Sequence, residues 1–202
     1  MIRRAVMVLA LPALIVAQEK PFVGQFTADM IQIVKGKPDS QKISVNRDRM
    51  RVEKKNKKGA TTVIIMRFDK GVTWTLMEKN QYMEMAGVSA KDVPTIKEKS
   101  EDVAEIKKLG EETVNGYPCE KTLCVFKDKS LGEVTQWISK KLMFAVKSET
   151  RRGGKVESSS ELKNIKEGAP ADSVFEIPPG YTKFEMPAGI GDMMKGIVPA
   201  AK

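Results

Sequence analysis

Residues 61–85, TTVIIMRFDKGVTWTLMEKNQYMEM, give the strongest indication of the fold. Residues 61–68 are rich in β-branched and apolar side chains, and Asp69-Lys70-Gly71 follows as a turn with a glycine available for positive φ. Apolar and hydroxyl side chains then alternate over Val72–Met77, and a second turn leads into a short strand at Tyr82–Met85. Strands joined by short turns at regular spacing predict an antiparallel meander or barrel.

The same pattern extends in both directions along the chain. Phe22–Val34 alternates, with Phe26, Ala28 and Met30 on one face. Asn115-Gly116 is a strong hairpin signal. Further strands are predicted at 43–45, 50–52, 109–114, 119–126, 133–139, 142–150 and 155–165, with a turn at 46–48 and irregular structure over 170–187.

One segment has a helical pattern instead. Thr95-Ile96-Lys97-Glu98 fits a capping box, and Ile96, Val103 and Ile106 share one helical face. An amphipathic helix is therefore predicted over Thr95–Lys108, crossing the concave side of the sheet. Its apolar face is expected to contact Phe26, Met30, Val45, Met50, Trp74 and Leu76.

The N-terminus has the pattern of a secretory signal peptide. Met1–Arg4 carries two arginines, an apolar run covers Ala5–Ala17, and the chain then becomes polar. We expect residues 1–17 to be removed on export to the periplasm, with an uncleaved anchor as the alternative. No cysteine lies near the cleavage point, so a lipid anchor is not expected. The predicted domain covers 18–186, and 187–202 is a Gly/Pro-punctuated tail that is flexible or forms a short helix.

Composition excludes most enzyme chemistry. The chain has no histidine and only two cysteines, which removes Ser-His and Cys-His catalysis and the usual zinc ligands. No catalytic residue, metal or cofactor is therefore predicted. The net charge is +9, with basic runs at 54–58 and 151–155. These runs either form solvated loops or attract the protein weakly to an anionic membrane surface. Export argues against nucleic acid as a partner.

The two cysteines leave two alternatives open. Cys119 and Cys124 fall in one predicted strand, where five residues span about 16 Å at ~3.3 Å per residue. A disulfide needs Cα atoms within ~7 Å, so geometry favours free thiols. An oxidising periplasm favours a bridge.

Methionine is concentrated in the first half of the predicted domain. Six methionines fall in or beside predicted strands: Met30, Met50, Met66, Met77, Met83 and Met85. Methionine is flexible and polarizable, so these residues either fill an irregular core or form a deformable lining for an acyl chain.

Several stretches, in this order, resemble a bacterial envelope family of unknown function within the LolA- and LolB-like superfamily of outer-membrane lipoprotein carriers. The stretches are Phe26–Met30, Ile43–Arg47, Met50–Val52, Ile65–Asp69, Val72–Met77, Val114–Cys119, Leu162–Lys166 and Asp172–Tyr181. The resemblance covers nearly the whole predicted domain.

The resemblance implies a mainly β, α+β fold: a curved antiparallel sheet forming an incomplete barrel with one or two helices on its concave side. It also implies a cavity for acyl chains, and Arg47 corresponds to an arginine associated with the carriers' ligand-binding cycle. The predicted ligand-binding residues are Met30, Arg47, Met50, Val52, Trp74, Leu76 and Met83.

The resulting functional hypothesis is a non-enzymatic periplasmic protein that binds a lipid, an acyl chain or a lipoprotein-like amphiphile. The alternative is an envelope structural or protein-interaction module that uses exposed sheet edges. Expected partners are a lipid or acylated ligand, and an anionic membrane surface or another envelope protein.

Overall fold

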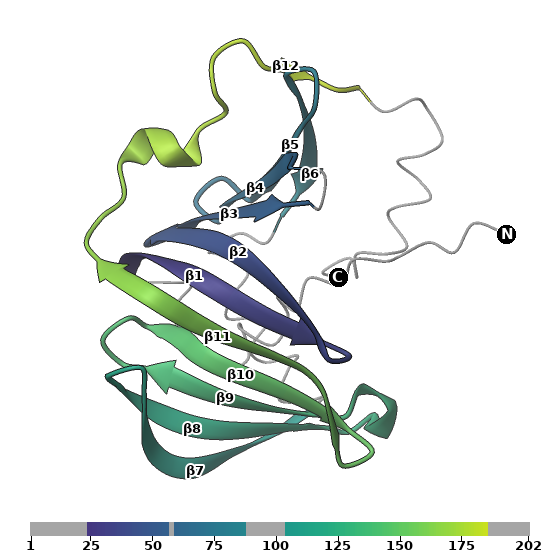
Figure 1. The fold of residues 1–202 in the computed structure, drawn as a ribbon, viewed down its shortest axis with the longest axis vertical. Coiled ribbons are helices and arrows are strands. Elements are labelled where there is room, and N and C mark those ends of the chain that lie inside the picture. Colours follow the sequence, from purple (N-terminus) through teal and green to yellow (C-terminus); the bar gives the residue numbers. More distant parts are fainter. Residues whose placement is uncertain (1–23, 57–58, 88–103, 186–202) are drawn as a thin grey trace, which may run out of the picture.

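The computed structural model describes residues 24–56, 59–87 and 104–185, and these form one large curved sheet (Figure 1). Its twelve strands lie in the order β12-β6-β5-β4-β3-β2-β1-β11-β10-β9-β8-β7. They are β1 (Gln25–Val34), β2 (Lys37–Asn46), β3 (Arg49–Lys55), β4 (Thr61–Arg67), β5 (Val72–Met77), β6 (Gln81–Ala86), β7 (Ala104–Val114), β8 (Tyr117–Phe126), β9 (Glu133–Ser139), β10 (Phe144–Arg152), β11 (Lys155–Glu167) and β12 (Thr182–Lys183). Every neighbouring pair is antiparallel except β12 and β6, which are parallel.

The sheet curves strongly but does not close. In the described part of the chain, β7 and β12 are its two edges and do not pair with each other. The prediction of one curved antiparallel sheet is therefore confirmed, and the predicted meander order holds from β1 to β6 and from β7 to β11. The two meanders form one sheet because β1, the first strand, pairs with β11, which lies more than a hundred residues later in the chain.

Short turns connect the strands as the sequence predicts. Asn115 and Gly116 both have positive φ, 50° and 82°, as the central residues of a two-residue hairpin turn require. Arg47 lies in the β2–β3 turn with a φ of 58°, and the predicted turn at 46–48 is confirmed there.

The predicted helix over Thr95–Lys108 is wrong in its last part. Residues 104–108 begin β7, where Ala104 pairs with Phe126 and Ile106 pairs with Cys124. Ile106 is 38% exposed rather than buried on a helix face. Ala104 and Ile106 are two residues apart, as strand alternation requires, and pairing with β8 decides for the strand. The remainder of the predicted helix, and the predicted segments 1–17 and 187–202, lie outside the described residues.

The main core lies where the two meanders meet. Phe26 of β1 and Phe144 of β10 contact edge to face, with ring centroids 5.4 Å apart. Ile43, Val45 and Leu162 are also fully buried in this cluster. This core fixes the curvature of the sheet that positions the surfaces described below.

Candidate ligand-binding face

The strand register of β1–β6 places all six methionines of this region on one face of the sheet. Met50, Met66, Thr73 and Met85 are directly opposite one another, in this order, on β3, β4, β5 and β6. In the next row Val52, Ile64, Thr75 and Met83 follow one another across β3–β6. Met30 and Met77 have the same orientation by alternation. We call this surface the methionine face.

Burial differs along the methionine face. Met50 and Met66 are buried in the main core. Met30, Met77, Met83 and Met85 are only partly buried. Burial therefore separates the methionines by position: Met50 and Met66 fill the core, whereas the others, on β1, β5 and β6, keep exposed surface.

A polar row continues the same face across the other half of the sheet. Gln32, Ser160, Ser148, Gln136 and Thr122 lie directly opposite one another on β1, β11, β10, β9 and β8. Ser148 and Ser160 share a hydrogen bond of 2.9 Å, and Gln41 donates to Gln32 at 3.2 Å. Gln136 and Thr122 are only 3% and 4% exposed. The face thus changes from thioethers to amides and hydroxyls within one sheet.

The opposite face of β3–β6 is covered by the chain itself. Val63, Ile65, Trp74 and Leu76 pack around Phe175, which is fully buried. Phe175 belongs to a 3-10 helix, η3 (Asp172–Phe175), in the segment after β11. This segment runs around the outer side of the sheet and ends as β12 beside β6 (Figure 1). We call residues 170–184 the strap.

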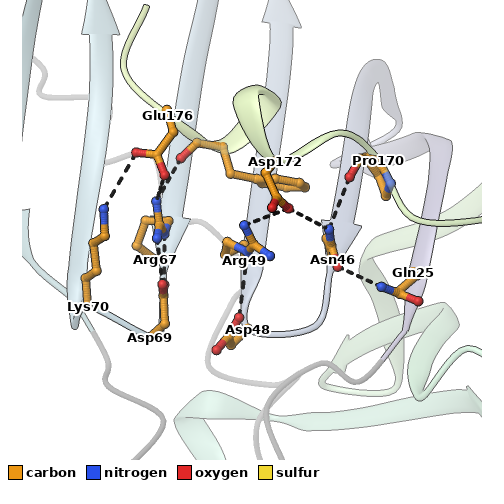
Figure 2. A network of polar contacts seen from close by, with 11 residues as sticks. Gln25, Asn46, Asp48, Arg49, Arg67, Asp69, Lys70, Pro170, Asp172 and Glu176 are labelled. Carbon is orange, nitrogen blue, oxygen red and sulfur yellow. Dashed lines mark hydrogen bonds and ion pairs between the residues drawn. The ribbon is translucent and has the colours of Figure 1, made fainter.

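Charged contacts hold the strap in place (Figure 2). Arg67 donates to Asp69 at 2.8 and 2.6 Å, and it also bonds Glu176 and the Phe175 carbonyl. Its side chain is only 6% exposed. The hydrogen bonds with Asp69 raise the pKa of Arg67, and the same bonds lower the pKa of Asp69. Arg67 therefore remains charged and links β4 to the strap.

A second set of contacts holds the beginning of the strap. Asn46 donates to the Pro170 carbonyl at 3.1 Å, and Arg49 pairs with Asp172 at 3.0 Å (Figure 2). Arg49 also lies over the Phe175 ring, 5.6 Å from its centroid. These polar side chains all come from β2–β4, so the strap follows the sheet closely.

The structure divides the seven predicted ligand-binding residues among three places. Met30, Met50, Val52 and Met83 lie together on the methionine face. Trp74 and Leu76 lie on the other face, under Phe175, because they alternate with Thr73 and Thr75. Arg47 is exposed in the β2–β3 turn, and its neighbour Asp48 contacts Arg49 at 3.8 Å rather than Arg47.

Sequence reasoning missed the polar row and the strap contacts. The row depends on the pairing of β1 with β11, which are more than a hundred residues apart in the chain. The strap contains the motif Asp172–Tyr181, for which the sequence predicts only the family resemblance and irregular structure. Phe175 inside that proline-rich motif was the available signal.

An open hollow of about 620 Å³ lies over β11, β1, β2 and β3. Its lining includes charges of both signs, among them Asp29, Lys42, Glu53 and Lys166. None of the seven predicted residues lines it. The hollow therefore does not correspond to the apolar cleft expected from the sequence.

Chemistry at the cysteines is limited by burial. Cys119 and Cys124 are both free and buried in β8, in agreement with the geometric argument. Burial raises the pKa of both thiols, which keeps them protonated and unreactive.

Within 24–56, 59–87 and 104–185, no three acidic or cysteine residues are arranged to hold a metal ion. The described residues also include no helix with the length and apolar character needed to span a bilayer.

A family model for a domain of unknown function, DUF4412, matches residues 22–143. The chain belongs to this family. The prediction of a family of unknown function is confirmed. A search of curated proteins finds no match to the sequence.

Solved structures with TM-scores above 0.5 share the fold at low sequence identity. An uncharacterized conserved protein from Thermus thermophilus has a TM-score of 0.57 at 11% identity, covering 80% of this chain and 90% of that one. MucB of Pseudomonas aeruginosa, in complex with MucA, has a TM-score of 0.56 at 16% identity over 76% of this chain. This chain spans 55% of MucB. A LolA superfamily protein from Nitrosomonas europaea matches at a TM-score of 0.35 and 10% identity, covering 80% and 92% of the two chains.

Proposed function

We propose that this protein is a non-enzymatic envelope protein that binds a lipid, an acyl chain or a similar amphiphile along the methionine face. The observation that carries the proposal is the placement of all six methionines of β1–β6 on one face, four of them only partly buried. Thioether side chains adapt to apolar ligands of varied shape. Residues 1–17 are proposed to direct export to the periplasm, which the intact mass of exported protein would test.

The methionine face suits the apolar part of such a ligand. Each acyl methylene removed from water contributes ~0.8 kcal/mol before the costs of association are subtracted. A chain of about ten methylenes would therefore bind usefully without a charged anchor. Met30 and Met83 remain in the proposed lining, and Met77 and Met85 join them. Met50 and Val52 lie beneath it in the main core. Trp74 and Leu76 leave it because Phe175 covers them.

The polar row suits the other end of an amphiphile. Gln32, Ser148 and Ser160 present amide and hydroxyl groups on the same face as the methionines. Such groups hydrogen-bond neutral or charged headgroups and fix the orientation of a ligand within an otherwise apolar site. An amphiphile lying across the sheet would place its acyl chain over β3–β6 and its headgroup over β1, β11 and β10.

Titration with a fluorescent fatty acid tests the proposal. The double variant Met83→Ser/Met85→Ser removes two partly buried thioethers from β6, and we expect its Kd for the probe to rise at least about tenfold. Leu109→Ser is the matched control, since Leu109 is 49% exposed on the edge strand β7, far from the methionine face. Equal affinity in the wild type and both variants would reject the methionine face as the site.

A protein-interaction module is the second candidate. MucB, which shares the fold, was crystallised in complex with MucA. Edge pairing at β7 is disfavoured here, because β7 carries Glu105, Lys107, Lys108, Glu111 and Glu112 and has a bulge between Lys108 and Gly110. Native mass spectrometry separates the two candidates: co-purifying lipid supports the first, and a stoichiometric protein without lipid supports the second.

A further inference from the structure

Three connections lie side by side at one rim of the sheet. They are the β1–β2 turn (residues 35–36), the β10–β11 turn (153–154) and the β8–β9 loop (127–132). The Lys35 amide donates to the Glu157 carbonyl at 2.9 Å, which joins the first two. Figure 1 shows all three at the same end of their strands. We call this surface the tip cluster, made of Ile33, Val34, Lys35, Lys37, Lys127, Lys129, Leu131, Lys155 and Val156.

The tip cluster concentrates exposed aliphatic side chains. The described residues include seven large hydrophobic side chains that are exposed, and four of them lie here. Ile33 is 42% exposed, Val34 45%, and Leu131 and Val156 are each 48% exposed. Exposed apolar residues gathered at one place mark an interaction site more often than residues scattered singly.

The lysines of the tip cluster differ from those of the opposite rim. Within the described residues, Lys35, Lys37, Lys127, Lys129 and Lys155 form no ion pair. At the opposite rim, Lys140 pairs with Glu111 at 2.8 Å and Lys141 with Glu167 at 2.7 Å. Positive charge is therefore in excess where the aliphatic side chains are exposed, with Asp128 as the acid of the β8–β9 loop, whereas Lys140 and Lys141 at the other end of the strands are paired with carboxylates.

We propose that the tip cluster docks the protein on an anionic lipid bilayer, with the aliphatic side chains entering the interface and the lysines facing lipid phosphates. Mixed aliphatic and basic tips fit an interface that is apolar below and negative above. Single-stranded nucleic acid is a poorer match, because base stacking needs aromatic side chains and the cluster has none. The proposal goes beyond amphiphile binding, and either can fail without the other.

Co-sedimentation of the mature chain with vesicles tests the docking. We expect binding to vesicles of 70% phosphatidylcholine and 30% phosphatidylglycerol, and little binding to phosphatidylcholine alone. Each lysine near such a surface contributes a factor of about five. Lys35→Glu/Lys37→Glu/Lys155→Glu should therefore weaken binding at least about a hundredfold. The control Lys140→Glu/Lys141→Glu/Lys166→Glu has the same change in net charge at the opposite rim and should stay within about threefold.

A second variant separates a bilayer from a soluble acidic partner. Val34→Ser/Leu131→Ser/Val156→Ser should lose about tenfold or more in vesicle binding while keeping its binding to polyglutamate. Circular dichroism checks that each variant is folded. The proposal is overturned if the wild type ignores anionic vesicles, if both charge variants lose binding equally, or if the serine variant binds vesicles as well as the wild type. The last result would assign the cluster to an acidic protein or polymer.

Discussion

The two faces of β3–β6 are built from alternate residues of the same strands, yet one is covered by another segment of the chain and the other is partly exposed. On one face Trp74 and Leu76 are sealed under Phe175 by the strap. On the other face Met83 and Met85 are only partly buried. The sealed face uses rigid aromatic and β-branched residues and a buried arginine, which pack in one arrangement. The methionine face uses flexible side chains that accept several arrangements. One face of the sheet therefore contributes to stability, and the other provides an adaptable surface.

The largest effect should come from breaking the sealed face. Phe175 is fully buried, so Phe175→Ala leaves a cavity over β4 and β5. We expect the free energy of unfolding to fall by about 3–5 kcal/mol. Urea unfolding followed by circular dichroism measures it.

Phe184→Ala is the matched control for this substitution. Phe184 lies just past β12 and is 38% exposed. Its replacement should cost less than about 1 kcal/mol. Similar losses for both variants, or a loss below about 1 kcal/mol for Phe175→Ala, would show that the strap does not seal this face.

The ion pair of Arg67 with Asp69, beside the strap, should also make stability depend on pH. Arg67 lowers the pKa of Asp69, whose unfolded-state pKa is about 3.9. The stabilisation is therefore present above about pH 4 and is lost as pH falls through the depressed pKa of the folded state. Asp69→Asn should cost about 1–2 kcal/mol at pH 7 and should flatten the fall in stability between pH 5 and pH 2.

Asp48→Asn provides the comparison for the pH experiment. Asp48 is 41% exposed and contacts Arg49 only at 3.8 Å. This variant should unfold with nearly the same pH dependence as the wild type. If Asp69→Asn and the wild type lose stability in parallel on acidification, the Arg67–Asp69 contact does not contribute as inferred.

The sequence predicts where the strands and turns lie, but not which face of the sheet each apolar side chain occupies. Alternation and turn residues locate the strands, and Asn115-Gly116 locates a hairpin, because each of these signals acts between near neighbours. Trp74 and Leu76 were expected beside Met50, because an apolar strand residue does not reveal which face it occupies or what covers it. Their cover, Phe175, comes from a segment a hundred residues later.

Two other errors have the same origin. The polar row from Gln32 to Thr122 exists only because β1 pairs with β11, and no local pattern encodes that pairing. Residues 104–108 have helical signals, yet they pair with β8. In each case a non-local contact decided between local alternatives.

The smallest predicted effect concerns Arg47, at the end of β2. Its backbone φ of 58° tolerates asparagine, whereas alanine would add strain unrelated to binding. Arg47→Asn should leave stability within about 0.5 kcal/mol of the wild type. Because Arg47 is exposed, it should contribute only a screened attraction to an anionic headgroup, so we expect the Kd of an acyl probe to rise about two- to threefold. The same substitution should reduce the dependence of that Kd on salt. A variant that keeps both the affinity and the salt dependence of the wild type would show that Arg47 takes no part in binding beside the methionine face and the polar row.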